Sequence, residues 1–315
     1  MKVAIIVLAE PRSHILATFA ARFRTEPWSG AVELAARLGY VARGLVYLSV
    51  GLVALLAALG VTPHARSALG AVEALSGWTA GVALLWFIGL GLCGFALWRA
   101  LQSFLDADGQ GKAASGLAAR AGQAVSGLVY GGLAVSVFSL LHTARNLKRP
   151  SEHAEMVRHI QTFLSFHGGG LLVIALGVFV LACGLGNMVR AVIGHFGRTL
   201  ACEEALAPWA GTVARVGYFA RGLALAPVGF FMARAGLYAR ASEAHGVGGA
   251  LETLHRQPMG GLLLGLTAAG LMAFGLFGFI EAAYRPICMT ALWGGGYAPP
   301  WRNTQNRKVR KLTPV

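Results

Sequence analysis

The sequence contains few charged residues and very few acidic ones. Only 13% of its 315 residues are charged, and Asp and Glu together number 13. A soluble domain usually carries about twice that charged share, roughly 25%. Hydrophobic residues make up 56% of the chain, and most of its apolar runs lack the polar face expected of a helix on a water-soluble core. The composition therefore predicts packed membrane helices instead of a soluble fold.

Acidic residues and lysine are absent from the central parts of six apolar runs. A helix needs about 20 residues to cross ~30 Å of hydrocarbon, and each run is about that long. The runs cover residues 41–60, 79–98, 122–142, 168–189, 216–236 and 260–280. We expect six transmembrane helices at these positions.

Cysteine is also scarce, and its spacing argues against two classes of site. The four cysteines, which form no CxxC pair, are Cys93, Cys183, Cys202 and Cys288. This pattern favours neither a disulfide framework nor a cysteine metal site. Cys93 and Cys183 lie inside apolar runs, where a small side chain serves to pack helices together.

Groups suited to acid–base or nucleophilic catalysis are missing as well. No pair of carboxylates lies within an apolar run, and neither Ser126 nor Ser136 has an identifiable base. Asp106 and Asp108 lie beside two glycines between runs, a composition typical of a turn. We therefore expect a non-enzymatic protein without a bound cofactor.

A short motif recurs along the chain and marks its organisation. Residues 36–44 read ARLGYVARG, residues 214–222 read ARVGYFARG, and a diverged copy at residues 119–127 reads ARAGQAVSG. Each copy opens a pair of apolar runs, so the sequence indicates three tandem units. We predict repeats at 28–108, 112–200 and 208–289, between a leader (1–27) and a tail (290–315).

The number of crossings in each repeat sets the expected architecture. Because each repeat crosses the membrane twice, all three have the same orientation. Parallel repeats indicate a pseudo-threefold bundle about the membrane normal, unlike the inverted repeats of many transporters. The predicted fold class is an all-α integral membrane protein of six transmembrane helices, arranged as three parallel two-helix repeats.

The basic residues predict how the chain sits in the membrane. The net charge is +14, and the Lys and Arg residues gather in the N-terminal segment, between apolar runs and in the tail. This distribution is a topology signal, and it argues against a nucleic-acid partner. It favours a multi-pass membrane protein with both termini in the cytoplasm. We expect the leader to lie at the membrane interface, and the basic termini to attract anionic lipid headgroups of the bilayer.

The repeated motif resembles a known family. The ARxGYxARG opening, an ALExL-type segment before the return helix (residues 71–75 and 250–254) and three helix pairs are similar to the bacterial membrane family called domain of unknown function 1206. The resemblance covers roughly residues 28–289. It implies a six-span protein of the bacterial cytoplasmic (inner) membrane with three repeats, and it implies no activity. The middle repeat departs from the pattern at Gln123, Ser126 and Gln161.

Within the motif, each residue type has an expected structural role. Tyr40 and Tyr218 are placed as interfacial aromatic anchors, and Gly44 and Gly222 allow close helix approach. Arg43 and Arg221 fall at the expected N-termini of helices, where the macrodipole disfavours a cation. The full set of motif residues is Arg37, Gly39, Tyr40, Arg43, Gly44, Arg215, Gly217, Tyr218, Arg221 and Gly222.

The arginines at these helix ends need a compensating group. Glu281 ends the sixth run close to where Arg221 begins the fifth, so we predict an ion pair between these two residues. The alternative is two independently solvated interfacial charges.

The positions of the histidines suggest one specific hypothesis, a metal or haem site. Seven of the nine histidines fall in the expected outer loops or at helix ends, and His142 and His167 flank the same loop. Converging imidazoles bind a metal or a haem, although solvated loop histidines give the same pattern.

Three functions remain after these exclusions. The first is a structural or interaction module of the membrane. The second is a small transporter or channel along the bundle axis, which usually needs ionisable groups at membrane depth. The third is a membrane metal or haem protein that uses His142 and His167.

Overall fold

The computed structural model describes residues 27–61, 79–108, 110–143, 152–166, 168–194, 207–285 and 287. Within these ranges the chain is all-helical. The long helices are α3 (Pro27–Ala58), α5 (Thr79–Phe104), α6 (Ala114–Thr143), α8 (Gly169–Ile193), α10 (Ala207–Leu237) and α12 (Gly260–Tyr284). The short ones are α7 (Glu152–Leu164), the 3₁₀ helix η1 (Ala241–Glu243) and α11 (Val247–His255). The leader 1–27 and the tail 290–315 lie almost wholly outside the described residues.

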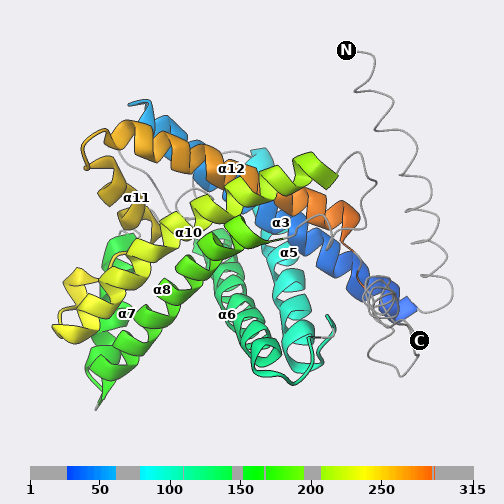
Figure 1. Cartoon of the computed structure of the whole chain (residues 1–315), viewed down its shortest axis with the longest axis horizontal. Coiled ribbons are helices and arrows are strands. Elements are labelled where there is room, and N and C mark those ends of the chain that lie inside the picture. Colours follow the sequence, from blue (N-terminus) through cyan, green and yellow to red (C-terminus); the bar gives the residue numbers. More distant parts are fainter. Residues whose placement is uncertain are drawn as a thin grey trace, which may run out of the picture.

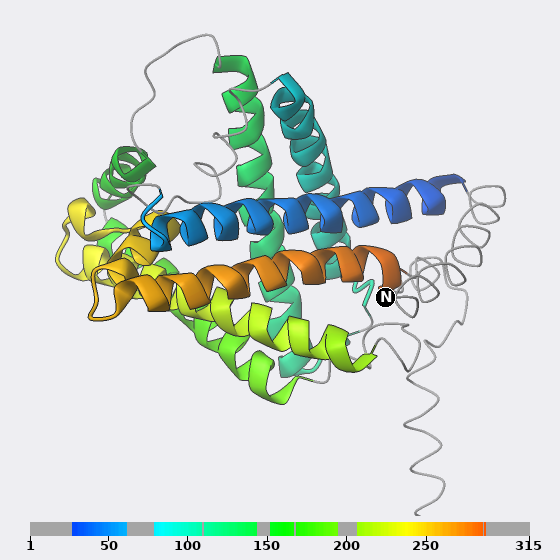
Figure 2. The same cartoon turned by 90° about the horizontal axis from the view of Figure 1, so that it is seen from above.

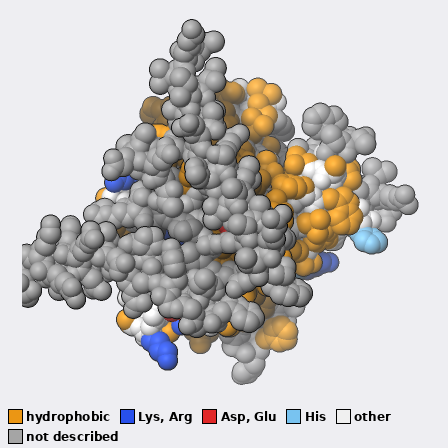
Figure 3. All heavy atoms as spheres, turned by 90° about the vertical axis from the view of Figure 1, so that its right-hand side faces the viewer, with side chains coloured by type: hydrophobic (Ala, Val, Ile, Leu, Met, Phe, Trp, Pro, Cys, Tyr) orange, Lys and Arg blue, Asp and Glu red, His pale blue; other side chains and the backbone are white. Residues whose placement is uncertain are grey.

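All six long helices are apolar and long enough to cross a membrane. Many of their large apolar side chains face outward; Leu128 of α6, Leu171 of α8 and Val192 of α8 are each more than 70% exposed. Figure 3 shows hydrophobic side chains over much of the described surface on one face. Water would penalise such a surface and lipid would not. The predicted multi-pass membrane protein with six transmembrane helices is therefore confirmed.

The first helix of each repeat starts earlier than its apolar run predicts. We call the first helix of a repeat its entry helix and the second its return helix. α3 begins at Pro27 instead of residue 41, α6 at Ala114 instead of 122, and α10 at Ala207 instead of 216. The motif therefore lies inside the entry helices. Arg43 and Arg221 occupy mid-helix positions, far from the helix ends that we expected.

The repeats interlock through a recurring type of helix contact. The return helix of one repeat packs against the entry helix of the next, as α5 does on α6 and α8 on α10. The last return helix, α12, packs on the first entry helix, α3, and the two lie side by side in Figures 1 and 2. The third repeat therefore packs against the first.

A closed pseudo-threefold bundle is not confirmed. Within a repeat, α3 contacts α5 and α10 contacts α12, but the described parts of α6 and α8 share no comparable interface. The α5–α6 pair also crosses α3 and α12 steeply in both views (Figures 1 and 2). The packing of a return helix on an entry helix thus recurs around the molecule. In the middle repeat, the described parts of the entry and return helices do not pack on each other.

The largest hydrophobic core lies where α3, α5, α6 and α12 meet. Its fully buried members include Leu92, Phe95 and Trp98 of α5 and Leu264 and Leu271 of α12. This core forms one wall of the polar cluster described next.

Candidate functional site

Glu281 is the centre of a buried polar cluster at the end of α12. Its Oε2 accepts a hydrogen bond from Arg43 of α3, and its Oε1 accepts one from Arg285 at 2.9 Å. The side chains of Arg43 and Glu281 are 1% and 5% exposed. The predicted pair of Arg221 with Glu281 is not formed, because among the described residues Glu281 makes its ion pairs with Arg43 and Arg285.

Close helix packing explains why Arg43 is the partner. A Cβ added to Gly44 would lie 2.8 Å from the carbonyl oxygen of Gly275, and one added to Gly278 would lie 3.0 Å from Cα of Gly44. Glycine removes the side chains that would hold α3 and α12 apart. The motif arginine of the first repeat is therefore brought against the carboxylate of the third.

Asp108 connects the second half of the cluster. It follows α5, and its Oδ2 accepts hydrogen bonds from Gln102 at 2.8 Å, Gln123 at 3.0 Å and Arg285 at 3.1 Å. These donors come from α5, from α6 and from just after α12. Asp108 lies in a turn, as its neighbouring glycines indicated, and it is also a link between repeats. The carboxylate of Asp106 supports the same segment, because it accepts hydrogen bonds from the backbone N–H groups of Gln110 and Gly111.

We define the polar cluster as these buried or half-buried groups together with one further arginine. Arg99 of α5 donates to Gln102 at 3.0 Å and lies 4.9 Å from the centroid of the Phe95 ring. The members are Arg43, Arg99, Gln102, Asp108, Gln123, Glu281 and Arg285. They come from α3, α5, α6 and α12 and from the segments that follow α5 and α12.

Arg285 stays charged in this setting. Burial alone would lower the pKa of its guanidinium, but Tyr40, Asp108 and Glu281 raise that pKa above its ordinary value. As a cation it bridges the two carboxylates.

The first arginine of the motif has a role that the sequence did not suggest. Arg37 donates to the backbone carbonyls of Ala282 and Ala283 in the last turn of α12. In the middle repeat, Arg120 donates to the carbonyls of Ser103 at 2.7 Å and Phe104 at 3.1 Å, at the end of α5. These carbonyls have no partner within their helices, and the negative end of the macrodipole favours a cation. Each arginine therefore caps the return helix packed beside it.

The third copy of this arginine, Arg215, is exposed on α10. No equivalent bond to α8 occurs within the ranges that the structure describes. The capping role is thus present at two of the three repeats.

Tyr40 and Tyr218 are core residues, which corrects the expectation of interfacial anchors. Tyr40 is fully buried, accepts a hydrogen bond from Nε1 of Trp98 at 3.2 Å and meets the Phe95 ring edge-on at 5.2 Å. Tyr218 is 5% exposed and meets Phe274 in the same way, also at 5.2 Å. Because the entry helices extend past the motif, these rings face a neighbouring helix instead of the lipid headgroups.

The two glycines beside these tyrosines allow this contact. A Cβ on Gly39 would lie 2.6 Å from the backbone N of Phe95, and one on Gly217 would lie 2.6 Å from Cα of Phe274. Gly222 approaches α8 equally closely, since its Cβ would lie 2.6 Å from the carbonyl oxygen of Gly184. The motif glycines therefore lie at helix contacts both within and between repeats.

Arg221 differs from its counterpart Arg43. Its Cζ lies 5.0 Å from the centroid of the Phe274 ring and 5.7 Å from that of Tyr47. Arg43 stacks on the same Phe274 ring at 5.0 Å. Tyr47 in turn bonds to Tyr130 of α6 through their hydroxyl groups at 3.2 Å. The Phe274 ring is thus contacted by two motif arginines and by two tyrosines, Tyr47 and Tyr218.

The predicted histidine site is not assembled by the described residues. His142 is exposed in the last turn of α6, and His167 lies outside those residues, so this pair stays a prediction. In the described chain, no three His, Cys, Asp or Glu side chains are grouped to hold a metal ion.

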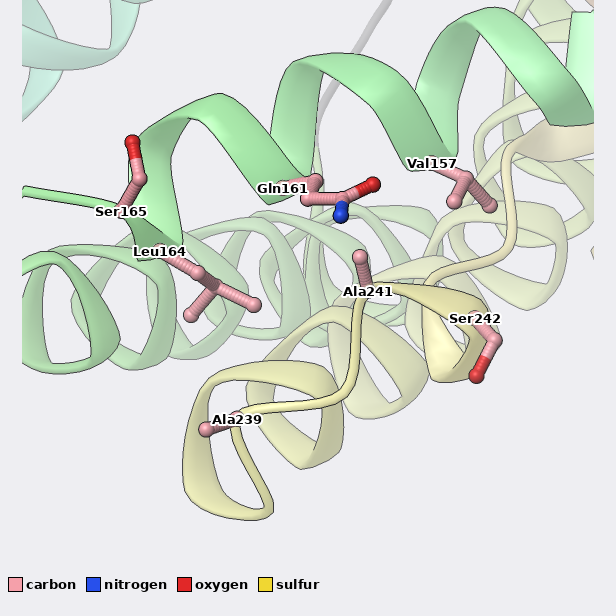
Figure 4. A pocket seen from close by; sticks show the side chains of 7 residues that line it. All are labelled: Val157, Gln161, Leu164, Ser165, Ala239, Ala241 and Ser242. Carbon is pink, nitrogen blue, oxygen red and sulfur yellow. The ribbon is translucent and has the colours of Figure 1, made fainter.

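A hollow of about 450 Å³ lies between α7 and η1, away from the polar cluster. Its walls are formed mainly by Val157, Leu164, Ala239 and Ala241, with Gln161 projecting into it (Figure 4). None of the described residues that line it is charged. We therefore take the polar cluster, and not this hollow, as the candidate site.

Comparison with known proteins agrees with the repeat structure. The family described as Domain of Unknown Function (DUF1206) matches residues 38–106 and 216–285, which lie in the first and third repeats. The chain is 28% identical over 265 residues to the uncharacterized protein YxxB of Bacillus subtilis (strain 168), an alignment that covers 83% of this chain and 93% of that protein. No solved structure matches the chain. The resemblance seen in the repeated motif is thus confirmed, since the DUF1206 family model matches the chain in two regions that carry the motif.

Proposed function

We propose that this protein is a non-enzymatic structural or interaction module of the bacterial cytoplasmic membrane. One observation carries the proposal: both carboxylates of the polar cluster accept hydrogen bonds from other helices. Glu281 accepts one arginine on each oxygen, and Asp108 accepts three donors from three segments of the chain. The cluster is built to join the repeats.

This arrangement argues against catalysis and against ion-coupled transport. A general acid or base must exchange a proton with its substrate, and a coupling carboxylate must release its partner during the transport cycle. Fixed arginine pairs on Glu281 oppose both. The carboxylates of this cluster therefore support a static role.

Transport remains the second candidate because the cluster carries an excess of positive charge. Arg43, Arg99 and Arg285 face two carboxylates, and Arg221 lies close by on the Phe274 ring. A cationic interior favours an anionic solute over a cation.

Flux and stability measurements on one variant separate the two candidates. Glu281→Gln removes a charge from the cluster, while Glu243→Gln removes one from the more exposed Arg234–Glu243 pair and is the matched control. A structural module predicts that Glu281→Gln lowers thermal stability and that vesicles with wild-type protein show no saturable solute uptake. Saturable uptake that Glu281→Gln abolishes and Glu243→Gln preserves would instead support transport.

We also propose that both termini lie in the cytoplasm, as the distribution of Lys and Arg favours. A reporter that is active only in the cytoplasm should work when fused to either end. A periplasm-specific reporter that is active at either end would contradict this topology.

A further inference from the structure

The three entry helices each contribute a polar side chain to one junction inside the protein. Tyr47 of α3 lies three residues after Gly44, and Tyr130 of α6 lies three residues after Gly127, so the two tyrosines occupy the same position in their repeats. Their hydroxyl oxygens are 3.2 Å apart. Arg221 of the third entry helix, α10, has its Cζ 5.7 Å from the centroid of the Tyr47 ring. All three repeats therefore meet at this point.

Hydrogen-bond donors at the junction outnumber the acceptors that the protein supplies. Tyr130 donates to the Tyr47 oxygen, and two hydroxyl groups bonded to each other leave one proton over whichever of them donates. The Nε of Arg221 is buried without a hydrogen-bond acceptor. Within the described chain, no hydrogen bond or ion pair engages the rest of its guanidinium. The junction thus presents N–H and O–H groups whose acceptor must come from elsewhere.

The charge of Arg221 is also unbalanced. Its guanidinium lies against the Phe274 ring at 5.0 Å, and Arg43 shares that ring but is already paired with Glu281. No carboxylate of a described residue pairs with Arg221. Contact with aromatic rings offsets part of the cost of a cation at membrane depth, and an ionisable residue at such a depth is characteristic of a functional site. A single negative charge would balance this cation.

The depth of the junction limits which anion can reach it. Tyr47, Tyr130 and Arg221 each lie more than ten residues from either end of their helices, which is ~15 Å or more at 1.5 Å per residue. A lipid phosphate at the membrane surface is too distant. Arg221 is half-buried, which leaves a route to its guanidinium. The surrounding aromatic rings have positive edges, which suit a compact anion.

We propose that Arg221 and Tyr47 form a binding site for a small monovalent inorganic anion, such as chloride, where the three entry helices meet. The guanidinium supplies the charge and N–H donors, and the Tyr47 hydroxyl supplies one further hydrogen bond. Tyr130 is a positioning residue, because its bond to the Tyr47 oxygen leaves the Tyr47 proton for the anion. This inference goes beyond the proposed structural role, and its test requires no measurement of flux.

The test measures the thermal unfolding of the full chain in detergent. Sodium chloride replaces sodium gluconate at constant ionic strength, because gluconate carries the same charge on a much larger ion. We expect the unfolding temperature to rise with the chloride concentration, as binding to the folded state requires. Equilibrium dialysis with radioactive chloride then measures the affinity directly.

Matched variants decide whether the effect belongs to this junction. Arg221→Gln should weaken chloride binding roughly tenfold or more, because it removes charge-assisted hydrogen bonds. Tyr47→Phe removes one neutral hydrogen bond and should weaken binding about fivefold. Arg215→Gln and Tyr238→Phe remove the same groups from exposed positions and should leave the affinity unchanged.

Two results would overturn the proposal. One is an unfolding temperature of the wild-type protein that is the same in chloride and in gluconate. The other is a chloride response in Arg221→Gln equal to that of the wild type, which would show a general effect of the salt. If Arg221→Gln does not fold, an unchanged chloride affinity in Tyr47→Phe is sufficient to reject the site.

Discussion

Arg43 and Glu281 lie 238 residues apart in the sequence and form a buried ion pair between α3 and α12. Through this pair the third repeat is joined to the first. Arg285 then carries the connection on to Asp108 at 3.1 Å, and so to the helices of the first and second repeats.

Removing the carboxylate of this pair should destabilise the protein strongly. Glu281→Gln leaves Arg43 buried without a counter-charge, and breaking such a pair costs about 3–5 kcal/mol. Equilibrium unfolding in mixed micelles measures the loss. The double variant Arg43→Gln/Glu281→Gln should recover part of it; a single variant as stable as the wild type would show that the pair is not coupled to folding.

The capping arginines provide a second prediction with a built-in control. Arg37→Met and Arg120→Met each remove charged hydrogen bonds to the last carbonyls of a return helix, so each should cost about 1.5–3 kcal/mol of unfolding free energy. Arg215→Met changes the corresponding exposed position and should stay within about 0.5 kcal/mol of the wild type. Equal losses in all three variants would disprove the capping role.

Glycine packing between α3 and α12 can be tested with a single methyl group. Gly44→Ala places its Cβ 2.8 Å from the carbonyl oxygen of Gly275, and such overpacking costs about 1–3 kcal/mol. Gly122→Ala is the control, because nothing lies within 4 Å of the Cβ position. That variant should gain up to about 1 kcal/mol from helix propensity. Resistance to proteolysis should fall in Gly44→Ala and should not fall in Gly122→Ala.

The two aspartates after α5 should differ in their response to substitution. Asp108→Asn removes the negative charge that binds Arg285, so we expect a loss of about 1–2 kcal/mol. Asp106→Asn should cost less, because the single side-chain oxygen of asparagine keeps one of the two backbone hydrogen bonds and asparagine tolerates the positive φ of 52° at this position. Unfolding curves of both variants measure the contrast, and the reverse order would show that the turn matters more than the link.

Hydropathy predicted the helices but not where the entry helices begin. The apolar run of the first repeat begins only near Arg43, because the charged residues before this point lower the local hydropathy. The helix continues to Pro27 since Arg43 is neutralised by Glu281, and since Arg37 is bound to Glu33 as well as to α12. Hydropathy averaged over neighbouring residues takes no account of partners that distant segments supply.

The same limit explains the error over Glu281. Alignment of the repeats predicted that Glu281 pairs with a motif arginine. It placed the pair within the third repeat, whereas the ion pair forms between the third repeat and the first. Asp108 was missed because its three donors converge only when α5, α6 and the residue after α12 have packed together.

The pairing of α3 with α12 has a consequence for biosynthesis. The ribosome makes Arg43 long before Glu281, and at about 5–20 residues per second the interval is on the order of tens of seconds. Throughout that time the newly inserted α3 holds an arginine whose final partner does not yet exist. Water or lipid phosphate must solvate this arginine until the last hairpin enters the bilayer, so a nascent chain truncated before α12 should be a substrate for membrane quality-control proteases.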